Sequence, residues 1–260
     1  MTAAKTILVT GAAQGLGLTT ATLLAQRAHR VILVDLKSVD DQSSRLRAQG
    51  GDVLGVSGDI SSESFVQELA QRIGRDYGAL DGLVNNAGIS LIVPAESTSA
   101  EQWQRVMAVN LFAPFLLCRY LGAQMLDLRR GSIVNVASIA GLAAVSHRSA
   151  YNASKHGLIG LTETLAAEWG GRGVRVNAVC PGWIKTEMDT ADQSSGAYSD
   201  RDIVERVPLG RFARPEDVAE AIAFLLDAQR SGFVNGVSLP VDGGWIADAS
   251  WTSLRLRTRA

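Results

Sequence analysis

The chain has 260 residues, of which 47% are hydrophobic and 20% charged, and its formal net charge at pH 7 is −1. This composition is ordinary for a globular protein with a large core. The small net charge gives no electrostatic basis for binding nucleic acid or an anionic membrane surface. Because no apolar run approaches a membrane span and residues 1–5 do not resemble a secretion signal, we expect a cytoplasmic protein with a small-molecule partner.

Cysteine and histidine are too sparse to suggest a disulfide framework or a histidine-rich metal site. Cys118 and Cys180 lie far apart without metal-ligand spacing, and the histidines are scattered at His29, His147 and His156. Two such cysteines are more typical of core residues than of chemistry. We therefore expect a site without a metal.

A glycine-rich turn joins the first predicted strand to the first predicted helix. Residues 5–10 form a β-branched and apolar run, glycines follow at 11, 15 and 17, and residues 18–28 have helical character. Gly11 permits a tight turn, Gly15 lets the backbone approach a pyrophosphate, and Gly17 lets the helix pack on the sheet. An ordinary turn between a strand and a helix also favours glycine, so the order of the elements carries the prediction of a dinucleotide-binding loop.

The second predicted strand, residues 31–34, ends at Asp35. A carboxylate at this strand end can accept both hydroxyls of an adenosine ribose and repels a 2′-phosphate, which favours NAD over NADP. The uncharged Gln14 agrees with this interpretation, whereas Lys37 is a mild signal for a phosphate. The alternative is that Asp35 is only a polar residue that ends a strand.

The third and fourth predicted strands also end in polar residues. Residues 52–57 precede Asp59-Ile60, residues 62–77 form a predicted helix, and residues 80–84 precede Asn85-Asn86-Ala87-Gly88. Ligands of open parallel sheets bind outside the carboxyl ends of the strands. We therefore expect both polar groups to lie beside the glycine turn, although Asn-Asn-Ala-Gly is also a favourable turn sequence.

Asn110 lies on the apolar stripe of the next predicted helix. This helix is expected to begin with Ser99 as its N-cap and Gln102 at the capping-box position, and its apolar face includes Trp103. A buried amide must find partners, so Asn110 is either structural or functional. Because Pro114 cannot donate to the Asn110 carbonyl, we expect a kink and a seat for an ordered water there, which favours function.

Three further apolar runs, residues 131–137, 175–179 and 237–241, continue the alternation of strands and helices. The pattern predicts a single doubly wound (Rossmann) α/β domain over residues 1–244, with a parallel sheet of about seven strands and helices on both faces. The polar segment 187–202 is longer than most connections and is expected to form a lid.

Tyr151 and Lys155 lie in a segment of helical character that follows Ser138, the end of the fifth predicted strand. At a spacing of four residues their side chains leave the same face of a helix. A free tyrosine is a poor base at neutral pH, but a fixed ammonium nearby favours its phenolate. An isolated pair with this spacing is usually a coincidence of surface residues, and the dinucleotide pattern upstream is what supports a proton-transfer role.

Taken together, these motifs resemble the short-chain dehydrogenase/reductase family over nearly the whole chain. The features that match are Thr10-Gly11-x-x-x-Gly15-x-Gly17, Asn85 to Gly88, Asn110, Ser138 with Tyr151-x-x-x-Lys155, and Asn177-Ala178-Val179-Cys180-Pro181-Gly182. The resemblance implies hydride transfer between a nicotinamide ring and a carbonyl or secondary alcohol, and the sequence after the predicted catalytic helix is similar to the sugar and polyol dehydrogenase branch.

The resemblance also implies roles for single residues. Tyr151 would exchange the proton, Lys155 would stabilise the phenolate and hold the nicotinamide ribose, and Ser138 would bind the same substrate oxygen. Asn110 would connect Lys155 to solvent through a water. The implied cofactor-binding residues are Gly11, Gln14, Gly15, Leu16, Gly17, Asp35, Leu36, Asp59, Ile60, Asn86, Ala87, Gly88, Tyr151, Lys155, Pro181, Gly182, Ile184 and Thr186.

The substrate is expected to meet Ser90, His147, Arg148 and Trp183 in addition to Ser138 and Tyr151. These residues favour a sugar or polyol oxidised with NAD, although Arg148 could instead meet an anionic group. A 3-oxoacyl or other ketone reductase is the alternative. A protein that only senses the dinucleotide is a third, but such a protein would be expected to lose one of the four catalytic positions, and all four are present.

Two features concern assembly. Residues 245–260 form an apolar and basic extension that is longer than usual in the family it resembles, and we expect it to dock on a neighbouring subunit rather than to be disordered. The family is usually a tetramer, and this chain has a stripe of small residues that suits close helix contact. Packing within one subunit would explain the same stripe, which consists of Ala153, Gly157, Gly160 and Thr164.

Overall fold

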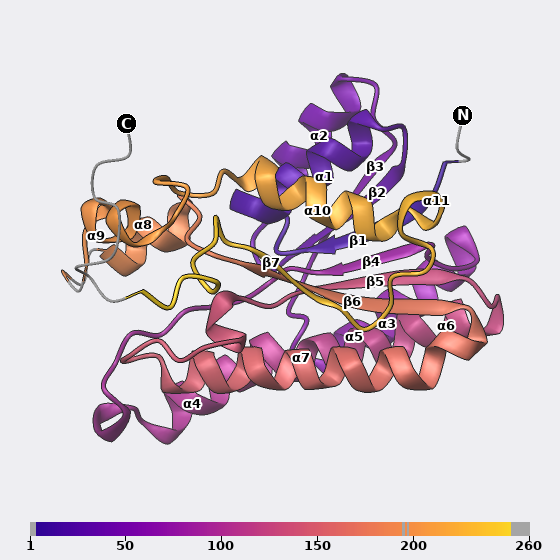
Figure 1. Ribbon diagram of the computed structural model, residues 1–260. Coiled ribbons are helices and arrows are strands. Elements are labelled where there is room, and N and C mark those ends of the chain that lie inside the picture. The colour runs from indigo at the N-terminus through magenta and orange to yellow at the C-terminus, as the bar shows by residue number, and fades with distance from the viewer. Residues whose placement is uncertain (1–3, 194–195, 197, 251–260) are drawn as a thin grey trace.

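The computed structural model describes residues 4–193, 196 and 198–250. At its centre is a seven-stranded sheet in the order β3-β2-β1-β4-β5-β6-β7, in which every pairing of neighbours is parallel (Figure 1). The strands are β1 (Thr6–Thr10), β2 (Arg30–Asp35), β3 (Val53–Ser57), β4 (Gly82–Asn85), β5 (Gly131–Val136), β6 (Val174–Pro181) and β7 (Ser238–Val241). The predicted doubly wound α/β fold is confirmed.

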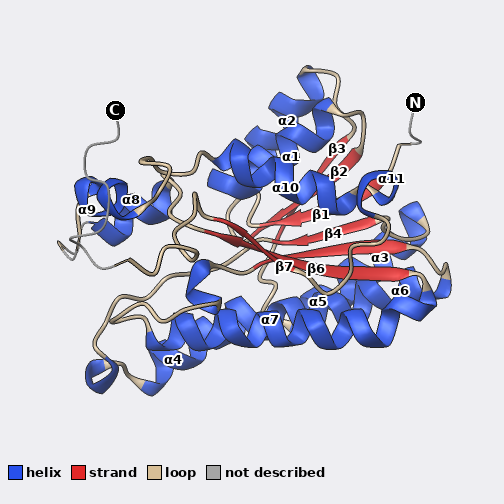
Figure 2. Ribbon diagram, in the orientation of Figure 1, coloured by secondary structure: helices blue, strands red, loops and turns tan. Residues whose placement is uncertain are grey.

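Helices cover both faces of the sheet (Figure 2). One layer contains α1 (Gly15–Gln26), α2 (Asp40–Ala48), α10 (Pro215–Leu226) and α11 (Ala228–Ser231). The other contains α3 (Glu63–Tyr77), α4 (Ala100–Met107), α5 (Ala113–Leu117), α6 (Ala123–Asp127) and α7 (Ser149–Trp169). Strands covered on both faces need apolar side chains at successive positions. In β1, Ile7 and Val9 pack in the core of the first layer and Leu8 in that of the second, and all three are fully buried.

The strand order reverses at β1, which places a crevice at the carboxyl ends of β1 and β4. Thr10 of β1 is in register with Val34 of β2, and Val9 is in register with Val84 of β4. The chain adds β2 and β3 on one side of β1 and all later strands on the other. Open α/β sheets bind ligands at such a point.

The helix starts follow the capping signals in the sequence. Ser62 caps α3 by accepting from the Phe65 amide. Ser99 and Gln102 form the predicted capping box of α4, because the Ser99 hydroxyl accepts from the Gln102 amide and the Gln102 side chain accepts from the Ser99 amide. The first helix, by contrast, begins at Gly15 rather than at residue 18, so the later glycines of the turn belong to its first turn.

Two π-helical turns interrupt the helix that bears Asn110. They are η2 (Ala108–Phe112) and η3 (Cys118–Gly122), and Pro114 lies just after the first of them. The irregularity at Asn110 fits the missing N–H of this proline. The continuous run Ala100–Asp127 is long and apolar enough to cross a membrane by length and composition alone, but more than half of its apolar window is buried inside the protein, as in a core helix.

The segment predicted as a lid contains two short helices, α8 (Glu187–Gln193) and α9 (Asp200–Arg206), beyond the carboxyl end of β6 (Figure 1). Residues 245–250 pack against the second of them, because the Arg206 guanidinium lies 4.8 Å from the Trp245 ring and pairs with Asp248 at 3.3 Å. The start of the C-terminal extension therefore contacts its own chain. Residues 251–260, to which the docking prediction mainly refers, lie outside the described residues.

Candidate active site

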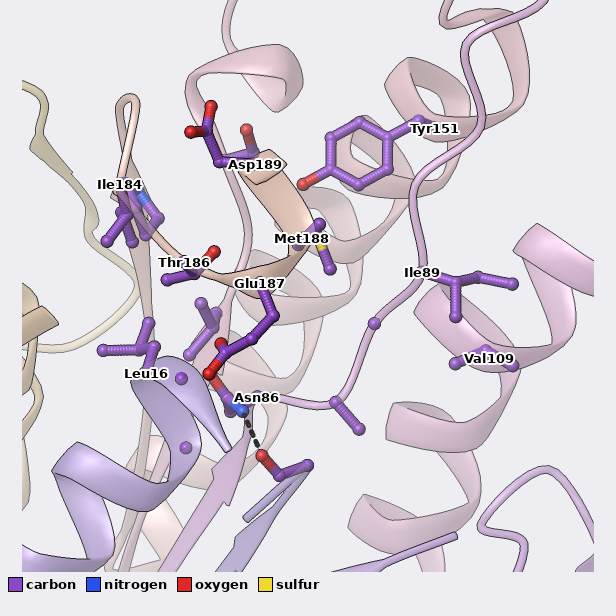
Figure 3. A pocket seen from close by; sticks show the side chains of 18 of the residues that line it. Leu16, Asn86, Ile89, Val109, Tyr151, Ile184, Thr186, Glu187, Met188 and Asp189 are labelled. Atoms are coloured by element: carbon purple, nitrogen blue, oxygen red, sulfur yellow. Dashed lines mark hydrogen bonds between the residues drawn. The ribbon is translucent and has the colours of Figure 1, made fainter. Parts of the chain in front are cut away.

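A cleft of about 480 Å³ runs along the carboxyl ends of the strands, which is the size range of ligand sites. It is bounded by the glycine turn, the ends of β2, β4 and β5, the start of α7 and the segment that leads into α8 (Figure 3). Every cofactor-binding residue predicted from the sequence lines it, as do Ser138, Arg148 and Trp183. Asn110, Ser90 and His147 do not, and each is considered below.

The glycine turn provides backbone groups for an anion. Gly11 and Gly15 adopt left-handed φ angles of 66° and 55°, and a Cβ on Gly17 would lie 2.0 Å from the Gly11 carbonyl oxygen. The first turn of α1 has neither a side-chain cap from Gln14 nor an acidic residue. Its N–H groups therefore face the cleft without a side-chain acceptor, so the turn fits a dinucleotide pyrophosphate.

The carboxylate of Asp35 stands at the end of β2 and organises the same turn. Its Oδ2 accepts from the Ala13 amide at 2.9 Å and its Oδ1 accepts from the Lys37 amide at 2.9 Å. A carboxylate has about four acceptor sites, so two hydrogen bonds leave capacity for ribose hydroxyls. The Lys37 ammonium donates to the Gln14 side chain at 2.8 Å. Lys37, the residue that favoured a phosphate in the sequence, therefore lies at the glycine turn.

Asn86 connects the turn after β4 to the glycine turn. Its side-chain amide donates to the Thr10 carbonyl at 2.9 Å and to the Gly11 carbonyl at 3.3 Å. The Thr10 hydroxyl accepts from the main-chain amides of Asn86 and Ala87. Farther along, Gly88 lies against the catalytic residues, because a Cβ there would be 3.3 Å from Asn110 Oδ1 and 3.6 Å from Lys155 Nζ. The segment Asn86 to Gly88 is therefore both the turn after β4 and part of the cleft wall.

The proton-transfer residues meet on the opposite wall of the cleft. Ser138 follows β5, and its hydroxyl accepts from the Ala140 amide at 3.1 Å and lies near Tyr151, whose pKa it lowers. Lys155 is buried, its Nζ lies 5.6 Å from the Tyr151 ring centroid, and it donates to the Val136 carbonyl at 2.8 Å. Figure 3 shows the Tyr151 hydroxyl directed into the cleft.

Burial dominates the proton affinities of this group. It raises the pKa of Tyr151, while the nearby Ser138 side chain and the charge of Arg148 lower it. Burial also lowers the pKa of Lys155 to about 8. The simple expectation that Lys155 depresses the pKa of Tyr151 is therefore not the leading effect in the protein alone, since desolvation disfavours both charged forms.

Asn110 lies behind this wall with no exposed surface. Its Oδ1 accepts from the Ile89 amide at 2.9 Å, and its Nδ2 donates to the Ile89 carbonyl at 3.0 Å and to the Ser154 hydroxyl at 3.1 Å. The side chain thus ties the loop after β4 to α7 next to Lys155. This is the structural alternative recognised from the sequence, and it leaves only the main chain of Asn110 for the expected water.

The cofactor segment after β6 closes the cleft beside α1. Pro181 ends the strand, Gly182 allows close approach to Asp242, and Ile184 forms an isolated bridge with Ala213. Figure 3 shows Ile184 and Thr186 on the wall of the cleft, with Leu16 beside them and the Glu187 side chain extending toward Asn86.

The predicted substrate residues divide into two groups. Arg148 is buried, donates to the Ser90 hydroxyl at 2.8 Å and pairs with Asp192 at 3.0 Å, and its guanidinium lies 5.5 Å from the Trp183 ring. Ser90 therefore does not line the cleft itself, but its hydroxyl positions the Arg148 guanidinium, which does. His147 must be corrected: its side chain is exposed and outside the cleft, because its left-handed φ of 59° turns the chain there, and only its carbonyl is used, by the Val93 amide.

Several cleft residues have no local signal in the sequence. Arg105 from α4 pairs with Asp59 at 3.6 Å. Glu187 approaches the glycine turn, since a Cβ on Gly15 would lie 3.2 Å from its Oε2. The predicted lid as a whole pointed to the charged residues of α8, whereas no signal pointed to Arg105. Lining residues that were not singled out from the sequence include Arg105, Val109, Glu187, Asp189, Asp192 and Tyr198.

Comparison with known proteins gives a family match over most of the chain. A family model described as enoyl-(acyl carrier protein) reductase matches residues 11–246. The chain is 38% identical to D-threitol dehydrogenase of Mycolicibacterium smegmatis, with 93% of this chain and 92% of the relative covered. It is 37% identical to a 3-oxoacyl-[acyl-carrier-protein] reductase of Thermotoga maritima, with 93% and 98% covered.

A solved structure with the same fold carries a nicotinamide dinucleotide. It is a candidate NAD(P)-dependent gluconate 5-dehydrogenase from Beutenbergia cavernae with NADP bound at low occupancy. The TM-score is 0.90 at 36% sequence identity, and the match covers 95% of this chain and 98% of the other. These matches show that the chain belongs to the short-chain dehydrogenase/reductase family of oxidoreductases that act on alcohols and carbonyls.

Proposed function

We propose that the protein is an NAD-dependent dehydrogenase of a sugar or polyol, with Tyr151 as the acid/base group. The observation that carries this proposal is the convergence in one cleft of a glycine turn suited to a pyrophosphate and the Ser138, Tyr151 and Lys155 side chains. An oxidised nicotinamide, when bound, supplies the hydride acceptor and a positive charge. The protein supplies the proton acceptor and the orientation of the substrate.

Tyr151 takes the proton of the substrate hydroxyl in oxidation and returns it in reduction. The Ser138 hydroxyl, which lines the same cleft as Tyr151, orients the same substrate oxygen. Lys155 stabilises the phenolate through its charge and presents donors to the nicotinamide ribose. Asn110 acts as a positioning residue through Ile89 and Ser154, and a water at its main-chain carbonyl that leads from Lys155 to solvent stays a prediction.

The preference for NAD rests on Asp35. Its carboxylate is fixed by two main-chain amides at the position where an adenosine 2′-hydroxyl or 2′-phosphate would lie, and a second negative charge there is unfavourable. Lys37 is engaged with Gln14. The structural relative with NADP argues in the other direction, so the cofactor preference must be measured directly.

A sugar or polyol is supported by the polar wall of Ser90, Arg148 and Trp183 and by the similarity to a threitol dehydrogenase. The alternative is a 3-oxoacyl or other ketone reductase, which the similarity to the Thermotoga maritima reductase favours. The Asp35 argument for NAD weighs against a biosynthetic reductase.

We also propose a cytoplasmic homotetramer. Trp103, Phe112 and Phe115 are substantially exposed on one helical run, and an apolar surface of this kind is typical of an interface. On α7, Gly160 is open, because no atom of the described residues lies within 4 Å of the place that a Cβ would take, whereas Gly157 already packs on Leu111 of its own chain. Only part of the small-residue stripe is therefore available for contact with a neighbour.

The test of the proposed function is a substrate panel followed by nicotinamide absorbance. Purified protein is mixed with NAD or NADP and with sugars, polyols, sugar acids and simple secondary alcohols, and in reverse with NADH or NADPH and 3-oxoacyl thioesters. Faster reduction of NAD than NADP by a sugar or polyol is the expected result. Turnover confined to NADPH and thioesters would favour the ketone reductase, and silence throughout would contradict both.

A further inference from the structure

Arg148 is a buried cation beside the proton-transfer residues. It immediately precedes α7, and its main chain is fixed by a bridge to Val93. Only 9% of its side chain is exposed. The guanidinium lies 5.9 Å from the Tyr151 ring and 5.5 Å from the Trp183 ring, so it borders the part of the cleft where the reacting carbon must lie.

The partners of this guanidinium come from two parts of the chain that are distant in sequence, the loop after β4 and helix α8. Nη1 donates to Ser90 Oγ at 2.8 Å, and Nη2 pairs with Asp192 Oδ2 at 3.0 Å. Ser90 donates to the same carboxylate oxygen at 3.0 Å, which closes a triangle. Asp192 lies on the seven-residue helix α8, whereas Arg148 and Ser90 belong to loops fixed by β4 and α7.

Because Arg148 and Asp192 are largely buried, removing the charge of either one is energetically costly. A buried ion pair contributes little net stability, but loss of one partner leaves an uncompensated charge and is strongly unfavourable. Asp192 therefore cannot leave Arg148 without another anion taking its place. A carboxylate of the substrate has the same charge and the same two acceptor oxygens, and guanidinium groups bind carboxylates in a bidentate manner.

The other charged groups near this position are already engaged. Lys155 donates to the Val136 carbonyl. Asp189, one turn from Asp192, accepts from the Tyr198 hydroxyl and pairs with Lys185. Lys37 and Arg105, the other cations that line the described cleft, contact Gln14 and Asp59 at the adenosine end. Arg148 is thus the cation placed to meet a substrate anion.

We propose that Arg148 is the specificity-determining residue for a carboxylate on the substrate, and that the substrate carboxylate takes the position that Asp192 occupies. This narrows the proposed sugar or polyol to one that carries a carboxylate, a polyhydroxy acid. This inference rests on the proposed function, since it assumes that the secondary alcohol reacts at Tyr151. Asp192 acts as an internal competitor that keeps the guanidinium paired between turnovers.

The test compares acid and neutral substrates in matched pairs, D-gluconate with D-glucitol and L-threonate with L-threitol. The measured quantity is the ratio of kcat/KM for the acid to kcat/KM for the neutral partner, because damage common to both substrates cancels. We expect Arg148→Gln to lower this ratio about 10- to 100-fold, the range for loss of a charged hydrogen bond. We expect Asp192→Asn to raise it about 3- to 10-fold by weakening the competitor.

Arg206→Gln is the matched control. Arg206 also pairs with an aspartate and lies over a tryptophan ring, but it packs on the C-terminal segment outside the cleft. The ratio should be unchanged in this variant. An equal ratio in wild type, Arg148→Gln and Asp192→Asn would overturn the inference and leave the proposed function intact.

A binding measurement keeps the inference testable if no substrate turns over. Calorimetric titration of the protein saturated with NADH should show that D-gluconate binds the wild type, binds Asp192→Asn more tightly and binds Arg148→Gln at least tenfold more weakly. Absence of gluconate and threonate binding to the wild type, or equal binding by all three proteins, would contradict it. Failure of turnover with this binding pattern present would contradict only the proposed reaction.

Discussion

The cofactor side of the cleft and its substrate side are held together by different kinds of contact. On the cofactor side, main-chain groups dominate: left-handed glycines, the uncapped start of α1 and a carboxylate fixed by two amides. On the substrate side, an ion pair between Asp192 of α8 and Arg148 before α7 closes the wall. In the first arrangement a Cβ on Gly11 or Gly17 would clash with neighbouring main-chain atoms. In the second, we propose that one charged partner is exchanged for another.

This difference separates what is common to dinucleotide-binding proteins from what selects a substrate. A main-chain cradle binds phosphate whatever the substrate is, because N–H groups are present at every position. Side-chain pairs on a short helix change with single substitutions and without disturbing the sheet. Changes to the main-chain cradle should therefore cost structure, whereas changes to charged side chains around the cleft should alter selectivity or affinity.

The largest effect is expected from Gly17→Ala on the cofactor side. The new Cβ would lie 2.0 Å from the Gly11 carbonyl oxygen and 2.6 Å from Asn86 Nδ2, so the turn must shift. We expect a loss of about 3 kcal/mol in the free energy of unfolding, together with loss of NADH binding, measured by urea unfolding and by NADH fluorescence.

Gly160→Ala is the control for this substitution. Among the described residues, no atom lies within 4 Å of its Cβ position, so the change should raise stability by up to about 1 kcal/mol through helix propensity. If it instead lowers both stability and the mass measured by light scattering, the proposed tetramer uses this surface. Full NADH binding by Gly17→Ala would contradict the rigid cradle.

The second prediction concerns the buried ammonium of Lys155, where the two sides of the cleft meet. Burial lowers its pKa from 10.5 to about 8, which corresponds to about 3 kcal/mol of stability. Because the unfolded chain binds this proton between those pH values and the folded protein does not, wild-type stability should rise as the pH increases from about 8 to 10.5. Urea unfolding of Lys155→Met should lack this rise, and parallel pH curves would refute the assignment.

A smaller effect is expected from Asp35→Asn. The substitution keeps an acceptor for the main-chain amides but removes the charge that opposes a 2′-phosphate. The ratio of kcat/KM with NAD to that with NADP should fall about 10- to 100-fold, with little change in thermal stability. An unaltered ratio would mean that Asp35 only supports the turn.

The smallest effect is expected from Glu187→Gln. The Glu187 carboxylate approaches the glycine turn near Gly15, where a pyrophosphate would also carry negative charge. Removing that repulsion should tighten NADH binding about 3- to 10-fold at low salt, and the gain should shrink as salt screens the charges. Weaker binding in this variant would show that Glu187 contributes a favourable contact instead.

The sequence predicted which residues border the cleft on the side proposed for the cofactor, because the signals there are local. The glycine turn, Asp35 and the caps at Ser62 and Ser99 each depend on residues a few positions apart. The fold class followed from the alternation of strands and helices. Boundaries were less accurate where an element used atypical residues, as at the start of α1 and the end of β6.

The substrate side was harder to predict because its contacts are long-range. Ser90 and Asp192 are 102 residues apart, and neither belongs to a pattern that marks a site. His147 was predicted as a polar residue that could meet a sugar or polyol, but its side chain is exposed and does not line the cleft. Asn110 was found from its apolar stripe, whereas its bonds to Ile89 and Ser154 depend on tertiary packing.

The most direct test of the proposed reaction is the rate of NAD reduction by Tyr151→Phe with the best substrate of the panel. The substitution removes only the hydroxyl, so NADH binding should match the wild type while kcat falls about 1000-fold, within the range for loss of a positioned acid/base group. Because burial raises the pKa of Tyr151, the wild-type oxidation rate should also increase with pH. Turnover by Tyr151→Phe within about tenfold of wild type, outside the range for such a group, would contradict the account.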